Sequence, residues 1–204
     1  MDDAPVNHRS TRGARCSLRS YASIPHGTAP AFLKEMSEPL TCGDLFAGAG
    51  GLSVGFHEAG FTPLFFNEID AQAAATFSLN FPHVKPFVCP IQELSAESIR
   101  RECSNSGMGL DVMVGGPPCQ GFSINAPIRS NDDPRNHLFR HYVRLVLEGL
   151  RPKFVVLENV PGLISHEGGR TLRDVVRAFE ETGYRVDFRI LNAAHYGEIG
   201  RAHV

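Results

Sequence analysis

The stretch Asp111–Ser123, which reads DVMVGGPPCQGFS, constrains this chain more than any other part of its sequence. Its opening residues form an apolar run typical of a buried strand, and the two glycines that follow allow the backbone to turn sharply. The two prolines each fix φ at about −65° and lack an N–H, so they stiffen the approach to Cys119. The stretch therefore predicts a thiol on a rigid loop at the carboxyl end of a strand, where open α/β sheets place their reactive groups. A buried structural cysteine is the alternative, because free cysteines are among the most buried residues.

A second motif lies upstream, at the end of another short apolar segment. Residues 41–46 (TCGDLF) predict a strand that runs into the glycine-rich turn 47–51 and then into a helix over 52–59, ended by Gly60. Glycines in such a turn let a ligand approach the backbone closely. Because NAD, flavin and adenosylmethionine proteins all use loops of this kind, the turn predicts a nucleotide-type binding edge without choosing among them.

An acidic residue follows the next predicted strand, which covers residues 63–67. Glu68 lies about eighteen positions after Gly50, close to the spacing at which βαβ folds place the carboxylate that binds ribose hydroxyls. Its alternative role is that of a carboxylate stabilised by the N-terminal dipole of a helix over residues 70–79. We expect the ribose role, because the glycine-rich turn precedes this residue.

The remainder of the chain alternates between strand and helix patterns. We expect strands over 87–88, 111–114, 153–157 and 185–192, and helices over 95–103 with Ser95 as its cap, 137–150 and 170–181. The run 153–157 is continuously apolar, as in a central parallel strand. The alternation predicts an α/β fold with a doubly wound, mostly parallel sheet.

Three of the predicted strands end in residues that can carry chemistry. They end in the glycine-rich turn, in the loop with Cys119, and in Glu158 of the sequence Glu-Asn-Val. Because the carboxyl ends of parallel strands share one edge of a sheet, a cofactor, a thiol and a carboxyl group can converge there. Glu158 is either an ordinary loop carboxylate or a general acid that keeps its proton through partial burial. We expect the second role.

Together these motifs resemble the cytosine-C5 DNA methyltransferases, and the resemblance runs from Thr41 to Gly197. It implies a Rossmann-like fold that binds S-adenosylmethionine and methylates carbon 5 of a cytosine flipped out of double-stranded DNA. Cys119 is then the nucleophile that adds to carbon 6, and Glu158 is the acid that stabilises the charge on the ring.

The resemblance also implies the surroundings of the two catalytic groups. The implied cofactor-binding residues are Phe46, Gly48, Gly50, Glu68, Ile69, Pro118 and Leu138, and the implied substrate-binding residues are Gln120, Ser123, Arg135 and Asn159. One position departs from the family. Pro90 precedes Ile91 where the family usually has an acidic residue that contacts the adenine amino group.

Composition narrows the class of protein further. The formal net charge of −2 lacks the basic excess of a complete nucleic-acid-binding protein, and no apolar run is long enough to span a membrane. The five cysteines include no C-x-x-C pair and the nine histidines show no ligand spacing, so we expect no metal site and a reduced intracellular compartment. We expect a monomer whose partners are DNA and, in a restriction-modification system, a cognate restriction endonuclease.

The two ends of the chain stand apart from the predicted catalytic domain, residues 39–197. Residues 1–38 contain four arginines and little pattern; they suit a transit peptide or a mis-called extension before Met36, but we expect a disordered basic arm. Residues 198–204 read EIGRAHV, which a common sequencing-library adapter encodes in this frame. We therefore expect a truncated gene whose 204-residue product lacks the target-recognition domain and is inactive.

Three other functions remain open at this point. A tRNA cytosine methyltransferase of the same family has similar motifs, although Gly121-Phe122-Ser123 resembles the DNA-modifying members. A catalytically silent module that binds adenosylmethionine needs neither Cys119 nor Glu158. A nicotinamide dehydrogenase shares the glycine-rich turn and Glu68 but has no use for the Pro-Pro-Cys-Gln loop.

Overall fold

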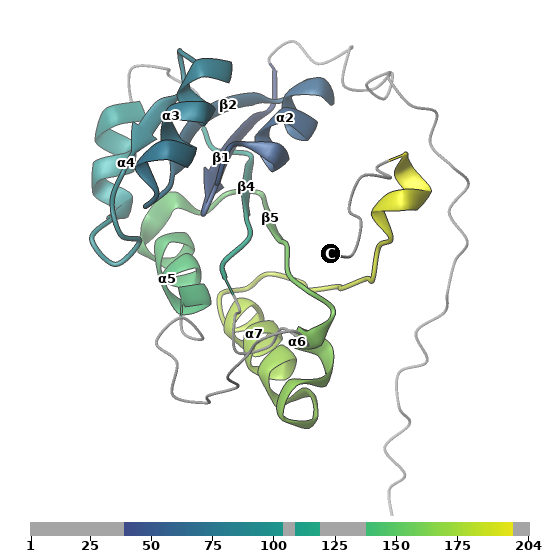
Figure 1. The fold of residues 1–204 in the computed structure, drawn as a ribbon. Helices are drawn as coiled ribbons and strands as arrows, with labels where there is room; N and C mark the ends of the chain where they lie inside the picture. The colour runs from purple at the N-terminus through teal and green to yellow at the C-terminus, as the bar shows by residue number, and fades with distance from the viewer. Residues whose placement is uncertain (1–38, 104–108, 119–137, 198–204) are drawn as a thin grey trace, which may run out of the picture. The chain divides into compact units, whose positions relative to one another are not determined.

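The structure is a computed structural model that describes residues 39–103, 109–118 and 138–197. A five-stranded, fully parallel sheet with the order β3-β2-β1-β4-β5 lies at its centre (Figure 1). The strands are β1 (Thr41–Leu45), β2 (Thr62–Asn67), β3 (Lys85–Phe87), β4 (Val112–Gly115) and β5 (Phe154–Leu157). The predicted α/β class and parallel sheet are therefore confirmed.

The order of the strands places a topological switch point between β1 and β4. The chain moves outward from β1 through β2 to β3, and then returns to the other side of β1 to form β4 and β5. In the register of the sheet, Leu45 is paired with both Asn67 and Gly115, and Gly115 is paired with Leu157. The loops that follow β1, β2, β4 and β5 therefore start side by side, at the crevice where open α/β sheets bind ligands.

Helices cover both faces of the sheet. One face packs against α2 (Gly51–Glu58) and α3 (Ala71–Asn80), and the other packs against α4 (Ala96–Cys103), α5 (Leu138–Leu145) and α7 (Arg170–Glu180). A π-helical turn, η4 (Val146–Leu150), extends α5, while α6 (Gly162–Ser165) and the 3-10 turn η5 (His166–Gly169) lead into α7. The 3-10 turn η6 (Ala193–Tyr196) belongs to a second unit of the chain. None of the helices in the described ranges is long and apolar enough to cross a membrane.

Local sequence signals explain where several helices begin and end. Asp70 caps α3, since its carboxylate accepts hydrogen bonds from the backbone N–H groups of Gln72 and Ala73 at 2.8 and 2.9 Å. Ser95 caps α4 through the N–H of Ser98 at 3.1 Å, as predicted. The sequence did not predict α6 and η5, because their short, glycine-containing segment lacks a helical period.

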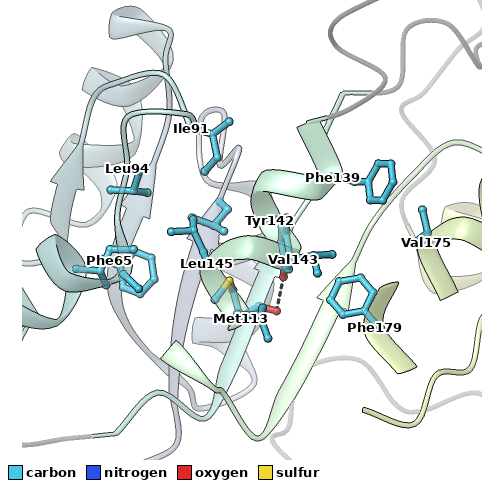
Figure 2. Packing of buried hydrophobic residues seen from close by; sticks show 14 residues of the cluster. Phe65, Ile91, Leu94, Met113, Phe139, Tyr142, Val143, Leu145, Val175 and Phe179 are labelled. Atoms are coloured by element: carbon cyan, nitrogen blue, oxygen red, sulfur yellow. Dashed lines mark hydrogen bonds between the residues drawn. The ribbon is translucent and has the colours of Figure 1, made fainter. Parts of the chain in front are cut away.

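The larger core cluster lies between the sheet and the helices α4, α5 and α7. Figure 2 shows how Phe65 and Met113 of the sheet pack with Tyr142 of α5 and Phe179 of α7. The Tyr142 hydroxyl is fully buried and lies 2.8 Å from the Met113 carbonyl and 3.2 Å from the Val156 carbonyl. A polar tip on a buried ring thus joins α5 to two neighbouring strands.

Two predictions about the second half of the chain are wrong. β5 is the outermost strand of the described sheet rather than a central one, and Phe154 is 67% exposed. Residues 185–192 alternate charged and apolar side chains but form no strand, because no described strand pairs with them. Phe188, Ile190 and Leu191 consequently remain exposed. Hydrophobic patterning reports which side chains prefer burial, and it does not supply the partner that a strand needs.

Candidate functional site

The glycine-rich turn after β1 has a backbone that few other sequences can adopt. Phe46, Gly48 and Gly50 all have positive φ, at 58°, 55° and 99°. A β-carbon at Gly50 would lie 2.9 Å from the ring of Phe77, so both the φ angle and the packing require glycine there. Phe46 adopts the left-handed region with an aromatic side chain, which costs conformational energy and is typical of ligand-binding turns.

Glu68 connects this turn to the start of α3. One carboxylate oxygen accepts a hydrogen bond from the Gly48 N–H at 2.7 Å, and the other accepts from Ile69 and Asp70 at 2.8 Å each. The alternative role considered from the sequence, a carboxylate just before a helix, therefore describes the contacts that Glu68 makes here. Since Ile69 is 68% exposed beside it, the same position is also open to a ligand.

Asn67 is a site residue that the sequence analysis did not identify. Its side chain is 2% exposed, and its Nδ2 donates to the carbonyls of Phe87 and Cys89 at 2.9 Å each. Asn67 thereby holds the segment that follows β3 against the end of β2. A buried polar residue that ends an apolar strand was the available signal, but the adjacent Glu68 offered the more obvious chemistry.

The ends of β4 and β5 meet at the segment that leads to Cys119. A β-carbon at Gly116 would lie 3.1 Å from Glu158 Oε2, and Asn159 Nδ2 donates to the Pro117 carbonyl at 3.1 Å. The structure therefore brings the Glu-Asn pair against the Gly-Pro backbone, as the shared sheet edge predicted. Asn159, for which we expect a role in substrate binding, contacts the segment before Cys119 in this structure.

Glu158 differs from the prediction in its burial. It is exposed rather than partly buried, because it follows β5, the edge strand of the described sheet. The partial burial that we expected for Glu158 is therefore contradicted by this structure.

Several predicted site residues fall outside the described part of the chain. They are Cys119, Gln120, Ser123 and Arg135. Their neighbours Pro118 and Leu138 are described, and both are partly buried. Leu138 begins α5 and packs against the larger core cluster. Five of the seven predicted cofactor-binding residues thus lie at the neighbouring ends of β1 and β2: Phe46, Gly48, Gly50, Glu68 and Ile69. A sixth, Pro118, follows the adjacent strand β4.

The described cysteines are poorly suited to act as nucleophiles. Burial, with a smaller effect from Asp44, raises the pKa of the Cys42 thiol to about 12. Burial is also the main cause of the raised pKa values of Cys89 and Cys103. Since the thiolate is the reactive form, these environments suppress reactivity. A reactive thiol therefore has to be sought among Cys16 and Cys119, which lie outside the described residues.

Asp44 is a second residue that the sequence analysis did not identify. It is 1% exposed on β1, and its Oδ2 accepts a hydrogen bond from the Ser53 hydroxyl of α2 at 2.7 Å. Burial raises the pKa of Asp44 to about 7, and the hydrogen bonds from Ser53 oppose this shift. An apolar strand pattern conceals such a residue, because a single buried carboxylate does not disturb the period.

Within the described ranges, no group of three or more histidine, cysteine, aspartate and glutamate side chains could hold a metal ion. The described groups at the sheet edge include the carboxylates of Glu68 and Glu158 and the side-chain amides of Asn67 and Asn159, and Cys119 follows β4 in the sequence. This combination suits a nucleophilic addition assisted by a carboxyl group.

Comparison with known proteins gives a consistent result. Residues 40–199 match the sequence pattern of the family described as C-5 cytosine-specific DNA methylase. The type II methyltransferase M1.HphI of Haemophilus parahaemolyticus is 43% identical over 160 residues, which cover 78% of this chain and 42% of the relative. The type II methyltransferase M.XorII of Xanthomonas oryzae pv. oryzae is 44% identical over 164 residues, which cover 79% of this chain and 38% of the relative.

A solved structure shows the same similarity in three dimensions. A candidate DNA modification methyltransferase encoded within a prophage of E. coli is 39% identical, with a TM-score of 0.60, over 70% of this chain and 38% of that protein. The chain thus spans about two fifths of the length of the curated relatives and of the solved structure that it matches.

Proposed function

We propose that this chain, which belongs to the C-5 cytosine-specific DNA methylase family, carries the cofactor-binding and catalytic edge of an enzyme that methylates cytosine in DNA. The observation that carries the proposal is the junction of β4 and β5. There Glu158 lies against Gly116, and Asn159 holds the Pro117 carbonyl two residues before Cys119. A carboxyl group and the approach to a thiol thus start from neighbouring strands.

S-adenosylmethionine is the cofactor that we propose, and the turn after β1 offers a place for it. The space beside Gly48 is open, since a β-carbon built there would meet no heavy atom within 4 Å apart from its chain neighbours. Glu68 would bind the ribose hydroxyls and Ile69 would cover the adenine, while Phe46 and Pro118 would line the remaining pocket. The bound cofactor supplies an electrophilic methyl group on a sulfonium.

The reaction that we propose begins with the Cys119 thiolate, which adds to carbon 6 of a flipped-out cytosine. Glu158 donates a proton or a hydrogen bond at N3, which stabilises the electrons displaced into the ring and makes carbon 5 nucleophilic. After carbon 5 has accepted the methyl group, loss of its proton and expulsion of the thiolate restore the aromatic ring. Gln120, Ser123 and Arg135 would approach the DNA.

The activity and partners of the whole protein are part of the proposal, since the chain matches about two fifths of its relatives. The curated relatives are type II methyltransferases, and this supports duplex DNA as the substrate and a cognate restriction endonuclease as a partner in the cell. It also favours DNA over tRNA among the substrates considered from the sequence. We propose that the protein acts as a monomer.

The test measures methyl transfer by the full product of the gene that encodes this chain. We expect radiolabelled adenosylmethionine to label duplex DNA, and Cys119→Ser and Glu158→Gln to lower the rate by at least about a hundredfold. Both variants should still bind the cofactor, which isothermal titration calorimetry can measure. Labelling of tRNA with none in DNA, or full activity of the Cys119→Ser variant, would contradict the proposal.

A further inference from the structure

Asp44 occupies an unusual position under the glycine-rich turn. It lies on β1, two residues before Phe46, and its side chain faces the α2 side of the sheet. Oδ2 accepts the hydroxyl hydrogen of Ser53, which is itself fully buried. Oδ1 is buried and, within the described residues, accepts no hydrogen bond. A carboxylate with one unsatisfied oxygen is costly in such a place.

A second carboxylate, that of Glu68, contacts the same turn. Glu68 accepts the Gly48 N–H, and it contributes to the electrostatic environment of Asp44. Neither Asp44 nor Glu68 forms an ion pair with a lysine, arginine or histidine of the described ranges. The Gly48 amide and the first amides of α3, which could attract an anion, are therefore already engaged by the carboxylates of Glu68 and Asp70.

We propose that Asp44 makes the turn selective for a cationic ligand, and that it distinguishes the sulfonium methyl donor from its neutral thioether product. This inference rests on the proposed function, because it takes the turn after β1 as the cofactor site. A buried charge acts through a low local dielectric, so it favours a positive ligand without direct contact. The same field disfavours a pyrophosphate, which a nicotinamide dehydrogenase would have to bind here.

The titration behaviour of Asp44 gives a second way to observe this effect. The ionisable groups whose charges couple to Asp44 are Cys42 on its own strand, Glu68 after β2 and, from the opposite side of the sheet, Tyr142 on α5; none of them is a cation. Because the carboxyl group titrates near neutral pH, its charge grows as the pH rises from 6 to 8. The preference for the sulfonium should grow over the same interval.

The test compares the affinities of the chain for S-adenosylmethionine and S-adenosylhomocysteine by isothermal titration calorimetry at pH 8. We expect Asp44→Asn to weaken binding of adenosylmethionine about tenfold and binding of adenosylhomocysteine by less than about twofold. The matched control is Glu58→Gln, which removes a carboxylate charge from an exposed position at the end of α2. This control should leave the ratio of the two affinities unchanged.

Each outcome has a defined meaning. If Asp44→Asn lowers the affinities for both ligands by the same factor, or lowers neither affinity, the inference is overturned while the cofactor site stands. If the wild-type chain binds neither ligand, the proposed cofactor site fails together with the inference. If Asp44→Asn does not fold, the two affinities of the wild-type chain are compared at pH 6 and pH 8. A ratio of the affinity for adenosylmethionine to that for adenosylhomocysteine that rises over this interval supports the inference, and a constant ratio overturns it.

Discussion

Glu68 accepts three backbone hydrogen bonds, and replacing it with glutamine changes the charge and the hydrogen-bonding pattern without changing the shape. The carboxylate uses one oxygen for the Gly48 N–H and the other for Ile69 and Asp70. Glutamine has one acceptor oxygen, so its NH2 group must face one of these donors. The variant therefore loses at least one hydrogen bond and brings two donors together.

The magnitude follows from the exposure of these bonds. A hydrogen bond to a charged group contributes about 1.5–3 kcal/mol, but the bonds to Ile69 and Asp70 are exposed and belong at or below the low end of that range. We expect Glu68→Gln to lower the free energy of unfolding by about 1–2 kcal/mol, which corresponds to a fall in Tm of about 2–8 °C. Because the turn after β1 is displaced, affinity for adenosylmethionine should fall at least about tenfold.

Thermal unfolding and calorimetric titration measure the two effects on the same samples. Glu58→Gln is the matched control, since Glu58 is an exposed residue at the end of α2 that undergoes the same chemical change. It should alter the Tm by less than about 1 °C and leave cofactor affinity unchanged. If Glu68→Gln behaves like the control in both measurements, Glu68 does not organise the turn and the reasoning is refuted.

Three further predictions concern stability. Folding raises the pKa of Asp44, so the free energy of unfolding should fall by about 3–4 kcal/mol in total as the pH rises from about 4 through 7. Urea titrations should show a weaker dependence of stability on pH in Asp44→Asn. Gly50→Ala should cost at least about 1 kcal/mol because of its φ of 99°, whereas Gly55→Ala inside α2 should be neutral or stabilising in the same titration. Tyr142→Phe should lower the unfolding free energy by about 1–2 kcal/mol, and an unchanged urea midpoint would contradict its bridging role.

The sequence predicted the parts of this fold that local patterns determine. The strand before Phe46, the glycine-rich turn and the acidic residue after β2 each have a physical reason at a fixed spacing, and all lie where they were expected. The convergence of Glu158 with the loop before Cys119 also followed from topology, because parallel strands share one edge. None of these inferences required knowledge of a side-chain contact.

The parts that could not be predicted depend on tertiary surroundings. The hydrogen bonds of Asn67 and Asp44 could not be predicted, because a sequence pattern does not reveal the partner of a buried polar residue. The edge position of β5 and the exposure of Glu158 depend on what lies beside the strand. An apolar run specifies burial, whereas the neighbour that provides it is a property of the whole fold.

The account depends centrally on Cys119 as the nucleophile, and a mechanism-based trap tests this claim most directly. Duplex DNA that contains 5-fluorocytosine is incubated with adenosylmethionine and the full product of the gene, and the adduct is digested and located by mass spectrometry. Fluorine at carbon 5 cannot leave as a proton does, so the thiol should remain attached to carbon 6. We expect a covalent adduct on the peptide that contains Cys119 and none in Cys119→Ser. An adduct on another cysteine, or methylated product without any adduct in the wild type, would contradict the account.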